Sequence, residues 1–388
     1  MRVLVLGAGM MGSAAACDLA RARGVTRVYV GDVNLRRAEN AAAMAHTDNI
    51  EPLCLDVADH SSLVRAMKMA GTTLAAVSYK VNLQLTHAAL EAGSHLCDLG
   101  GNNTVVREQL KLTLRARAKG VTIIPDCGLA PGLACLMAAR GLAQIGGQAE
   151  SLEIRVGGLP QHPRPPLNYK LVFAPSGLIN EYVEPCLVVR DGKTVTVEPM
   201  TELEAVEFPA PFGTLEAFHT SGGLSTLPES FAGRITNMQY KTLRYPGHCE
   251  RMKAMLDLGL KSDQLIDLPS GQRVRPREVF ERVLEQSLVN DDQDAVLVRV
   301  SLLHQGRTHV QEIIDKQDAK SGHTAMMRTT AYPAAVIAWL MASGAIRERG
   351  VLPQEQCVPL DGFFQEIEKR GIEIVSSATS PKGKPTER

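Results

Sequence analysis

The chain has 388 residues, of which 45% are hydrophobic and 22% are charged, proportions that are ordinary for a globular protein. This length favours two domains over one. Basic and acidic residues number 42 each, so the formal net charge is zero, which excludes the basic surplus of a typical nucleic-acid-binding protein.

The N-terminal segment MRVLVLGAGMMG passes from a short apolar stretch directly into glycines, without the cleavage pattern of a signal peptide. No stretch approaches about 20 uninterrupted apolar residues, so we expect no membrane span. The cysteines are scattered without a CxxC pair, which favours reduced thiols in a cytoplasmic protein and does not indicate zinc. We therefore expect a cytoplasmic protein without a metal, a membrane partner or a nucleic-acid partner.

Residues 2 to about 126 alternate short apolar strands with helical stretches. The expected strands are RVLVLG, RVYVGD, PLCLDV, LAAVSY, HLCDLG and VTIIPD, and the expected helices are 12–23, 34–46, 61–69, 82–92 and 104–119. Alternation at this spacing predicts an α/β domain with a Rossmann-type doubly wound parallel sheet, which we place at residues 1–130.

The pattern changes after about residue 131. The proline-rich segment GLPQHPRPPLNYK excludes a helix, and the turns at RDGK and Gln305–Gly306 each predict a hairpin. We therefore expect a second, mixed α+β domain with a largely antiparallel sheet over 131–327, for substrate binding and dimerisation. Apolar residues 328–344 predict a buried helix, so C-terminal helices within 328–372 are expected to complete the first domain. A disordered tail is expected over 376–388.

The first strand leads into a glycine turn. Gly7, Gly9 and Gly12 have the G-x-G-x-x-G spacing that lets a pyrophosphate approach the backbone at a helix N-terminus. Asp32 ends the second strand, where a carboxylate would bind ribose hydroxyls and repel a 2′-phosphate. These features predict NAD as cofactor; the alternative is a glycine turn without a dinucleotide.

Other cofactor contacts are expected after the strands, because ligands lie at the carboxyl ends of parallel strands. Arg36 and Arg37 leave the choice between NAD and NADP open. Tyr79 is expected near the nicotinamide ribose and the substrate, unless it is only a half-buried surface aromatic. The remaining candidates for cofactor binding are Met10, Met11, Val33, Asp56, Val57, Ser78, Tyr79 and Asp98.

Asp126 ends a buried apolar strand in VTIIPDCGLAPG. A carboxylate at this position either caps the following helix or binds substrate. Asp98 has the same position on the previous strand and the same two interpretations. Helix capping alone would account for both residues, so the pattern leaves the choice open.

The second domain contains four further candidates. Lys170, which follows Tyr169 in PPLNYK, would be a base only if burial lowered its pKa; otherwise it is a solvated surface lysine. His219 lies in EAFHTSGGLST and is a base, a hydrogen-bond donor or a structural histidine. Its small and polar neighbours, which include Thr220 and Gly223, are not expected to bury it.

The segment TLRYPGHCE contributes Arg244, a candidate clamp for a substrate carboxylate, and His248. The residues alone therefore predict a nicotinamide oxidoreductase with a separate substrate domain. Its substrate is expected to carry a carboxylate.

Six segments together resemble the saccharopine dehydrogenase-like family, from residue 1 to about 370. They are VLVLGAGMMG, VTIIPDCGLAPG, VGGLPQHPRPPLNYK, EAFHTSGGLSTL, YKTLRYPGHCE and RTTAYPAA. The likeness is greatest to the branch that acts on the ε-amine of L-lysine. It implies NAD-dependent oxidative deamination of L-lysine to 2-aminoadipate 6-semialdehyde, which cyclises to 1-piperideine-6-carboxylate, with release of ammonia. It also implies a homodimer or a higher homo-oligomer.

In this chemistry the ε-ammonium loses a proton before hydride leaves, and water then attacks an iminium with the help of a base. A carboxylate attracts both cations, whereas a charged lysine repels them. We therefore favour Asp126 at the amine end and His219 as proton acceptor or water-positioning group. Lys170 would act only when neutral, or beside Arg244 at the carboxylate end, and Tyr169 is a further candidate.

Two alternatives remain open. One is an NAD(P) reductase that forms a secondary amine, of the saccharopine or carboxynorspermidine dehydrogenase type. The other is a non-catalytic protein that senses NADH.

Overall fold

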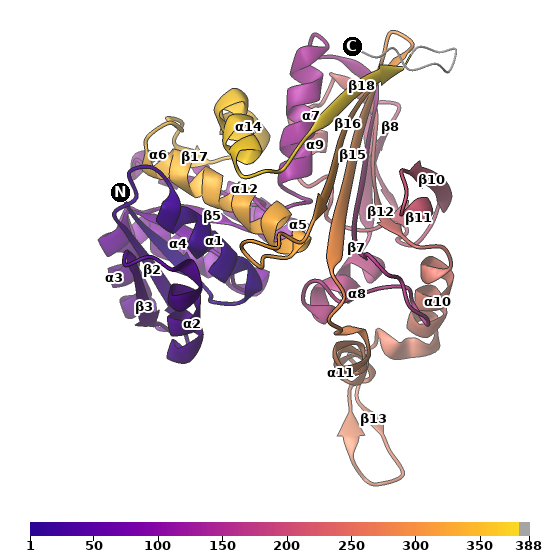
Figure 1. Cartoon of the computed structure of the whole chain (residues 1–388), viewed down its shortest axis with the longest axis horizontal. Coiled ribbons are helices and arrows are strands. Elements are labelled where there is room, and N and C mark those ends of the chain that lie inside the picture. The colour runs from indigo at the N-terminus through magenta and orange to yellow at the C-terminus, as the bar shows by residue number, and fades with distance from the viewer. Residues whose placement is uncertain (380–388) are drawn as a thin grey trace. The chain divides into compact units, whose positions relative to one another are not determined.

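The computed structural model of the chain describes residues 1–379 and divides into two compact units (Figure 1). Unit 1 consists of Met1–Gln144, Ser225–Phe231 and Met327–Ile374. Unit 2 consists of Ile145–Leu224, Ala232–Met326 and the chain from Val375. The first segment of unit 1 thus extends beyond the predicted boundary at residue 130, and Ser225–Phe231 is an addition that the sequence did not predict.

Unit 1 contains a seven-stranded parallel sheet in the order β17-β6-β5-β4-β1-β2-β3. The strands are β1 (Arg2–Leu6), β2 (Arg27–Asp32), β3 (Ile50–Cys54), β4 (Thr72–Ala75), β5 (His95–Asp98), β6 (Thr122–Ile124) and β17 (Gly350–Val351). The chain builds outward from β1 in both directions, so the order reverses between β1 and β4. In doubly wound sheets the ligand crevice opens at this reversal.

Helices cover the sheet of unit 1. The pair α1 (Met10–Arg21) and α2 (Leu35–Ala45) pack together, as do α3 (His60–Ala70) and α4 (Asn82–Ala92). The other helices are η1 (Tyr79–Val81), α5 (Asn103–Leu110), α6 (Thr113–Ala118), α7 (Leu133–Gln144), α9 (Leu227–Ser230), α12 (Ala325–Ala342), α13 (Gln354–Cys357) and α14 (Leu360–Lys369). The Rossmann-type α/β prediction is confirmed, although the helix expected over 104–119 is broken into α5 and α6.

The core of unit 1 lies where apolar strands meet apolar helix faces. Val3, Leu4 and Leu6 of β1 are fully buried, as a parallel strand covered on both faces requires. The predicted apolar helix is α12, in which Ala334 and Ile337 are also fully buried.

Unit 2 contains a nine-stranded sheet in the order β10-β11-β12-β7-β15-β16-β18, with β8 beside β12 and β9 beside β8. The strands are β7 (Ala149–Pro160), β8 (Cys186–Arg190), β9 (Lys193–Val197), β10 (Glu204–Phe208), β11 (Gly213–His219), β12 (Ile235–Arg244), β15 (Asp294–His304), β16 (Arg307–Lys316) and β18 (Val375–Thr379). Only β12 and β7 pair in parallel, so the prediction of a largely antiparallel sheet is confirmed. Both predicted hairpins form, as β8–β9 and β15–β16.

The helices of unit 2 are α8 (Pro175–Val183), α10 (His248–Met255), η2 (Leu256–Leu260) and α11 (Pro276–Leu288), beside a two-stranded β13 (Ile266–Asp267) and β14 (Arg273–Val274). The prediction of disorder from residue 376 is wrong for 376–379, which form β18 against β16. Residues 380–388 lie outside the described residues. None of the helices within residues 1–379 is both long and apolar enough to cross a membrane.

Candidate functional site

The glycine turn of unit 1 joins β1 to α1. Gly7 has φ +90°, and a side chain on Gly12 would lie 1.8 Å from the Gly7 carbonyl oxygen, so both positions need glycine. A side chain on Gly9 would meet no atom within 4 Å. Gly9 precedes α1 without a side-chain cap, so open space lies at a helix N-terminus whose amide groups are free for an anion.

Asp32 holds this turn from the end of β2. Its carboxylate accepts the backbone N–H of Ala8 (2.8 Å) and of Asn34 (2.8 Å). Each oxygen retains a second lone pair that a ribose hydroxyl could use. Met10 and Val33 lie beside it with 52% and 69% of their surface exposed, which provides an apolar surface for a purine. The turn therefore fits a dinucleotide.

The other candidates around the sheet edge differ in accessibility. Asp56 is exposed and accepts the N–H of Ala58 (2.9 Å), whereas Val57 is half-buried and packs against the core. Ser78 is exposed after β4, and Met11 is half-buried in the first turn of α1. These positions are compatible with cofactor contacts.

The end of β5 brings Tyr79 and Asp126 to one short loop. A side chain on Gly100 would lie 1.7 Å from Asp126 Oδ1, and one on Gly101 would lie 3.2 Å from the ring of Tyr79. Asp98 fixes the loop, because its Oδ1 accepts the N–H of Gly100 (2.8 Å). Tyr79, the two glycines and Asp126 thus meet at the carboxyl ends of β4, β5 and β6.

Asp98 itself is fully buried. Its Oδ2 accepts from the side-chain amide of Gln109 (2.8 Å). Burial raises the pKa of Asp98. With both oxygens engaged by the protein, its position is that of a loop anchor.

Asp126 is only 3% exposed and has a left-handed backbone with φ +61°. Its Oδ2 accepts a hydrogen bond from the hydroxyl of Ser225, while Oδ1 is buried without a partner among the described residues. The helix α7 begins only at Leu133, so Asp126 is not its cap.

The environment of Asp126 favours the neutral acid. Burial raises its pKa to about 7, and the nearby carboxyls of Asp98 and Glu355 raise it too. The hydrogen bond from Ser225 lowers the pKa but does not offset burial. A carboxyl that titrates near neutral pH suits proton transfer.

Glu355 on α13 is a second, half-buried acid that the sequence did not single out. Its Oε1 accepts the hydroxyls of Thr226 (2.7 Å) and Ser230 (2.5 Å), and burial raises its pKa. The preceding residue, Gln354, donates to the backbone oxygen of Asp126 (2.6 Å). Segment Ser225–Phe231 therefore supplies hydroxyl groups to both acids.

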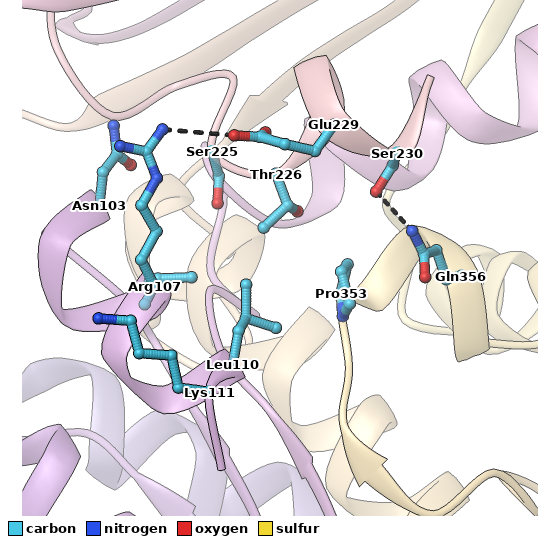
Figure 2. A pocket seen from close by; sticks show the side chains of 11 residues that line it. Asn103, Arg107, Leu110, Lys111, Ser225, Thr226, Glu229, Ser230, Pro353 and Gln356 are labelled. Atoms are coloured by element: carbon cyan, nitrogen blue, oxygen red, sulfur yellow. Dashed lines mark hydrogen bonds and ion pairs between the residues drawn. The ribbon is translucent and has the colours of Figure 1, made fainter. Parts of the chain in front are cut away.

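A cavity of about 400 Å³ lies beside these residues within unit 1. Figure 2 shows Arg107 of α5 and Lys111, which follows that helix, on one side and Ser225 and Thr226 on the other. Arg107 pairs with Glu229 at 3.3 Å across the rim. No local pattern predicts this cavity, because three separate segments of the chain line it.

In unit 2, Arg244 is 3% exposed and begins a directional chain of hydrogen bonds. Its Nε donates to the hydroxyl of Tyr182 (2.9 Å), which donates to His248 Nε2 (3.0 Å). His248 Nδ1 in turn donates to the carbonyl of Leu167 (3.0 Å). Burial, followed by the charge of Arg244, lowers the pKa of His248 to about 3, so the ring is neutral.

The ring of Tyr169 lies 4.8 Å from the Arg244 guanidinium, in cation–π geometry. Its hydroxyl is buried without a hydrogen-bond partner among residues 1–379, and burial raises its pKa to about 12. Glu181 is half-buried nearby; burial raises its pKa to about 7, and Arg244 counteracts this. The structure therefore brings together the predicted residues Tyr169, Arg244 and His248.

His219 does not join that cluster. It is fully buried at the end of β11, so the expectation of little burial is wrong: β11 lies between β10 and β12. Its Nδ1 lies 3.1 Å from the carbonyl of Tyr240 and its Nε2 lies 3.1 Å from Glu202 Oε2. Burial lowers the pKa of His219, although both acceptors oppose this.

The neighbours of His219 are engaged as well. The hydroxyl of Thr220 bonds that of Thr242 at 2.8 Å. A side chain on Gly223 would lie 2.2 Å from the ring of Tyr240. Glycine is therefore needed here because the ring of Tyr240 packs directly against the backbone. Lys170 is half-buried and donates to the carbonyl of Asp292.

Comparison with known proteins gives the family. The model of the saccharopine dehydrogenase NADP binding domain matches residues 3–124, and that of the saccharopine dehydrogenase C-terminal domain matches residues 128–372. The chain belongs to the saccharopine dehydrogenase family. It is therefore a member of an oxidoreductase family with a nicotinamide-dinucleotide-binding domain.

Relatives within the family are distant. The saccharopine dehydrogenase (NADP(+), L-glutamate-forming) of Pyricularia oryzae is 25% identical over 309 residues, 77% of this chain and 66% of that protein. The protein of the same name from Saccharomyces cerevisiae is 24% identical over 248 residues, 60% of this chain and 54% of the relative. The alpha-aminoadipic semialdehyde synthase of Arabidopsis thaliana is 25% identical over 320 residues, 75% of this chain but 30% of the relative. The chain thus spans less than two thirds of each relative.

A solved structure, the apo saccharopine dehydrogenase (L-Glu forming) from Saccharomyces cerevisiae, superposes with a TM-score of 0.78. It covers 97% of this chain and 99% of that chain at 19% identity. The two proteins share a fold.

Proposed function

We propose that this protein is an NAD-dependent L-lysine 6-dehydrogenase that oxidatively deaminates the ε-amine of L-lysine. The product would be 2-aminoadipate 6-semialdehyde, which cyclises to 1-piperideine-6-carboxylate, with release of ammonia. The likeness of PPLNYK, EAFHTSGG and RYPGH to the lysine-deaminating branch supports this substrate, and the relatives named for saccharopine and aminoadipic semialdehyde support lysine-related chemistry.

One observation carries the proposal: the Oδ1 of Asp126 is buried and has no partner among the described residues. A buried acceptor without a partner is costly, so it is a natural place for a donor from a ligand. An amine cation at this oxygen would stabilise the carboxylate, which could then take a proton from the ammonium. The pKa of about 7 suits that exchange near neutral pH.

NAD, when bound, supplies a hydride acceptor. Gly7, Gly9 and Gly12 would admit its pyrophosphate to the N-terminus of α1, and Asp32 would accept ribose hydroxyls. A 2′-phosphate would meet the negative charge of Asp32, which supports NAD; the NADP name of the family model and exposed Arg36 keep NADP as the alternative to test.

Arg244 and Tyr169 are proposed to recognise a carboxylate. The hydroxyl of Tyr169 is buried without a hydrogen-bond partner among the described residues, and its ring lies against the guanidinium of Arg244. Guanidinium and phenol donors together match two carboxylate oxygens.

The remaining candidates receive supporting roles. His219 is enclosed by Tyr240 and Glu202, and neutral His248 orients Tyr182, so we assign neither to proton transfer with substrate. We assign Lys170 to holding the Asp292 carbonyl, and Asp98 to holding the loop of Gly100.

The test is an absorbance screen near 340 nm, with ammonia measured in parallel. L-lysine, L-ornithine and saccharopine are each combined with NAD or NADP. We expect NADH and ammonia only with L-lysine and NAD. Dinucleotide binding without turnover of any of the three would support the NADH-sensing alternative instead.

Asp126→Asn should then lower kcat by roughly 10²–10⁴, because the amide cannot accept a proton. The control is Glu91→Gln, which neutralises an exposed carboxylate on α4. Equal activity of Asp126→Asn and wild type would refute the role of this carboxyl.

A second function, a reductase that forms a secondary amine of the saccharopine type, is favoured by the family models and by the NADP-dependent relatives. NADPH oxidation that requires both an aldehyde and an amino acid would establish it in place of the first.

A further inference from the structure

Asp126 and the cavity beside α5 share one side chain, that of Ser225. Its hydroxyl donates to Asp126 Oδ2, and the same residue lines the cavity (Figure 2). Both residues are buried, whereas Arg107 and Glu229 at the rim have more than half of their side chains exposed, so water reaches the cavity. The Ser225 hydroxyl therefore links a buried carboxyl to solvent.

Among the described hydrogen-bond partners of the Asp126 carboxyl, this hydroxyl is the group able to relay a proton. The other hydrogen-bond donor to the carboxyl within residues 1–379 is the backbone N–H of Gly101, and Oδ1 has no partner. A backbone amide donates only, whereas a hydroxyl donates and accepts at once.

We propose that Ser225 orients the carboxyl of Asp126 and carries the proton that this carboxyl accepts to water in the cavity beside α5. The proposal rests on the proposed function for the origin of that proton. Rotation of the carboxyl group after the proton has been accepted at Oδ1 would bring the protonated oxygen to Ser225. Protonated Asp126 then donates to Ser225 Oγ while the hydroxyl hydrogen passes to water. One proton leaves the carboxyl, one reaches water, and the serine is unchanged.

The backbone of both partners supports a functional role for this bond. Ser225 has φ +45° and Asp126 has φ +61°, conformations that cost energy for residues other than glycine. A β-branched replacement at Ser225 would add strain, whereas asparagine tolerates this conformation. Asparagine therefore retains a donor to Asp126 but lacks a hydroxyl to relay the proton.

The charged and titratable groups that face Asp126 are Asp98 on β5, Glu355 on α13 and Cys135 on α7. Asp98 and Glu355 raise the pKa of Asp126, while Ser225 is the largest influence that lowers it. Removal of the hydroxyl should therefore raise this pKa further.

The first experiment titrates Asp126 without cofactor or substrate, so it does not depend on the identity of the substrate. The C=O stretch of the protonated carboxyl is followed against pH by infrared difference spectroscopy and assigned by its loss in Asp126→Asn. Ser225→Ala should move the titration upward by about 1–2 pH units, and Ser225→Asn should leave it near that of wild type. Ser62→Ala, which removes a hydroxyl donor to Asp59 (2.6 Å), should not move it.

The second experiment follows proton release with a pH-indicator dye during turnover of the amine substrate. In wild type, release should keep pace with NADH formation, whereas in Ser225→Asn it should lag behind. An unchanged titration in Ser225→Ala would overturn the orienting role, and proton release that keeps pace in both Ser225 variants would overturn the relay. Failure of L-lysine as substrate would overturn the proposed function alone, since the titration would still decide the role of Ser225.

Discussion

At the scale of single residues, burial fixes the charge of the histidine in the unit 2 cluster. Burial and the charge of Arg244 lower the pKa of His248 to about 3, so the ring is neutral. Its Nδ1 donates to the carbonyl of Leu167, so its Nε2 is an acceptor and the hydroxyl of Tyr182 donates to it. The positive charge of Arg244 is therefore held in place by two neutral side chains, those of Tyr182 and His248.

Tyr182→Phe should destabilise the protein by about 1–3 kcal/mol, because it leaves the buried Arg244 Nε and His248 Nε2 without partners. Tyr169→Phe is the matched control: its hydroxyl has no partner among the described residues, so its loss should change stability little. Tyr169→Phe should instead raise KM for the carboxylate substrate. The free energy of unfolding of both variants is measured by urea denaturation. Equal destabilisation by the two substitutions would contradict the role of the Tyr182 hydroxyl as the partner of Arg244 and His248.

Asp126 should also make stability depend on pH. Its folded pKa of about 7 exceeds the ordinary value of 3.8, so the folded state binds the proton more tightly than the unfolded state. The free energy of unfolding should therefore fall as pH rises between these values, by up to about 4 kcal/mol, and level off above neutral pH.

Asp126→Asn removes this dependence. The free energy of unfolding of wild type and variant is measured by denaturant titration from about pH 4 to pH 8. The difference between the two proteins gives the contribution of Asp126 to the pH dependence, because the other acids contribute equally to both. A difference that stays constant across this range would show that the carboxyl titrates normally.

At the scale of elements, local pattern predicted most of the secondary structure. Apolar runs ending in glycine or aspartate marked the parallel strands, and turn residues marked both hairpins. The break between α5 and α6 was missed, because charges spaced for a solvent face continue through Lys111. The strand β18 was missed since its polar residues resemble a tail, and only pairing with β16 gives them order.

The candidate site was predictable only where its residues adjoin a strand. Gly7, Asp32 and Asp126 were recognisable because each follows an apolar run. Ser225 was not, because it lies 99 residues from Asp126 along the chain and no local signal connects them. The burial of His219 was likewise set by strands on either side.

Two glycines at the turn between β1 and α1 should differ in their roles, one in stability and the other in dinucleotide binding. Gly12→Ala should destabilise unit 1, because its side chain would collide with the Gly7 carbonyl at 1.8 Å. Gly9→Ala meets no protein atom, so stability should change by less than about 0.5 kcal/mol, whereas dinucleotide affinity should fall at least ~10-fold. Thermal unfolding and NADH fluorescence titration test both; normal binding by Gly9→Ala would contradict the proposed cofactor site.

At the scale of the whole molecule, unit 1 is discontinuous. Its sheet takes β17 beside β6, and α12 contributes residues that are fully buried, such as Ala334 against Cys97. Neither feature belongs to the first 144 residues, although most of the sheet does.

A fragment of residues 1–144 should therefore lack a cooperative unfolding transition, because it leaves β6 without its edge strand and the α12 face open to water. A matched fragment that joins 1–144 to 327–374 through a flexible linker should regain the transition. Circular dichroism against temperature compares them, and cooperative melting of 1–144 alone would show that the later segments are dispensable.

Because unit 1 is built from three separate segments of the chain, its parts are synthesised at different times. Asp126 leaves the ribosome well before Ser225 and long before Glu355, the groups that complete its surroundings. Until both segments have been made, we expect this carboxyl to be open to water and to titrate as an ordinary, ionised aspartate. We expect it to become an acid with a pKa near neutrality only after residues through Glu355 have been synthesised and have packed around it.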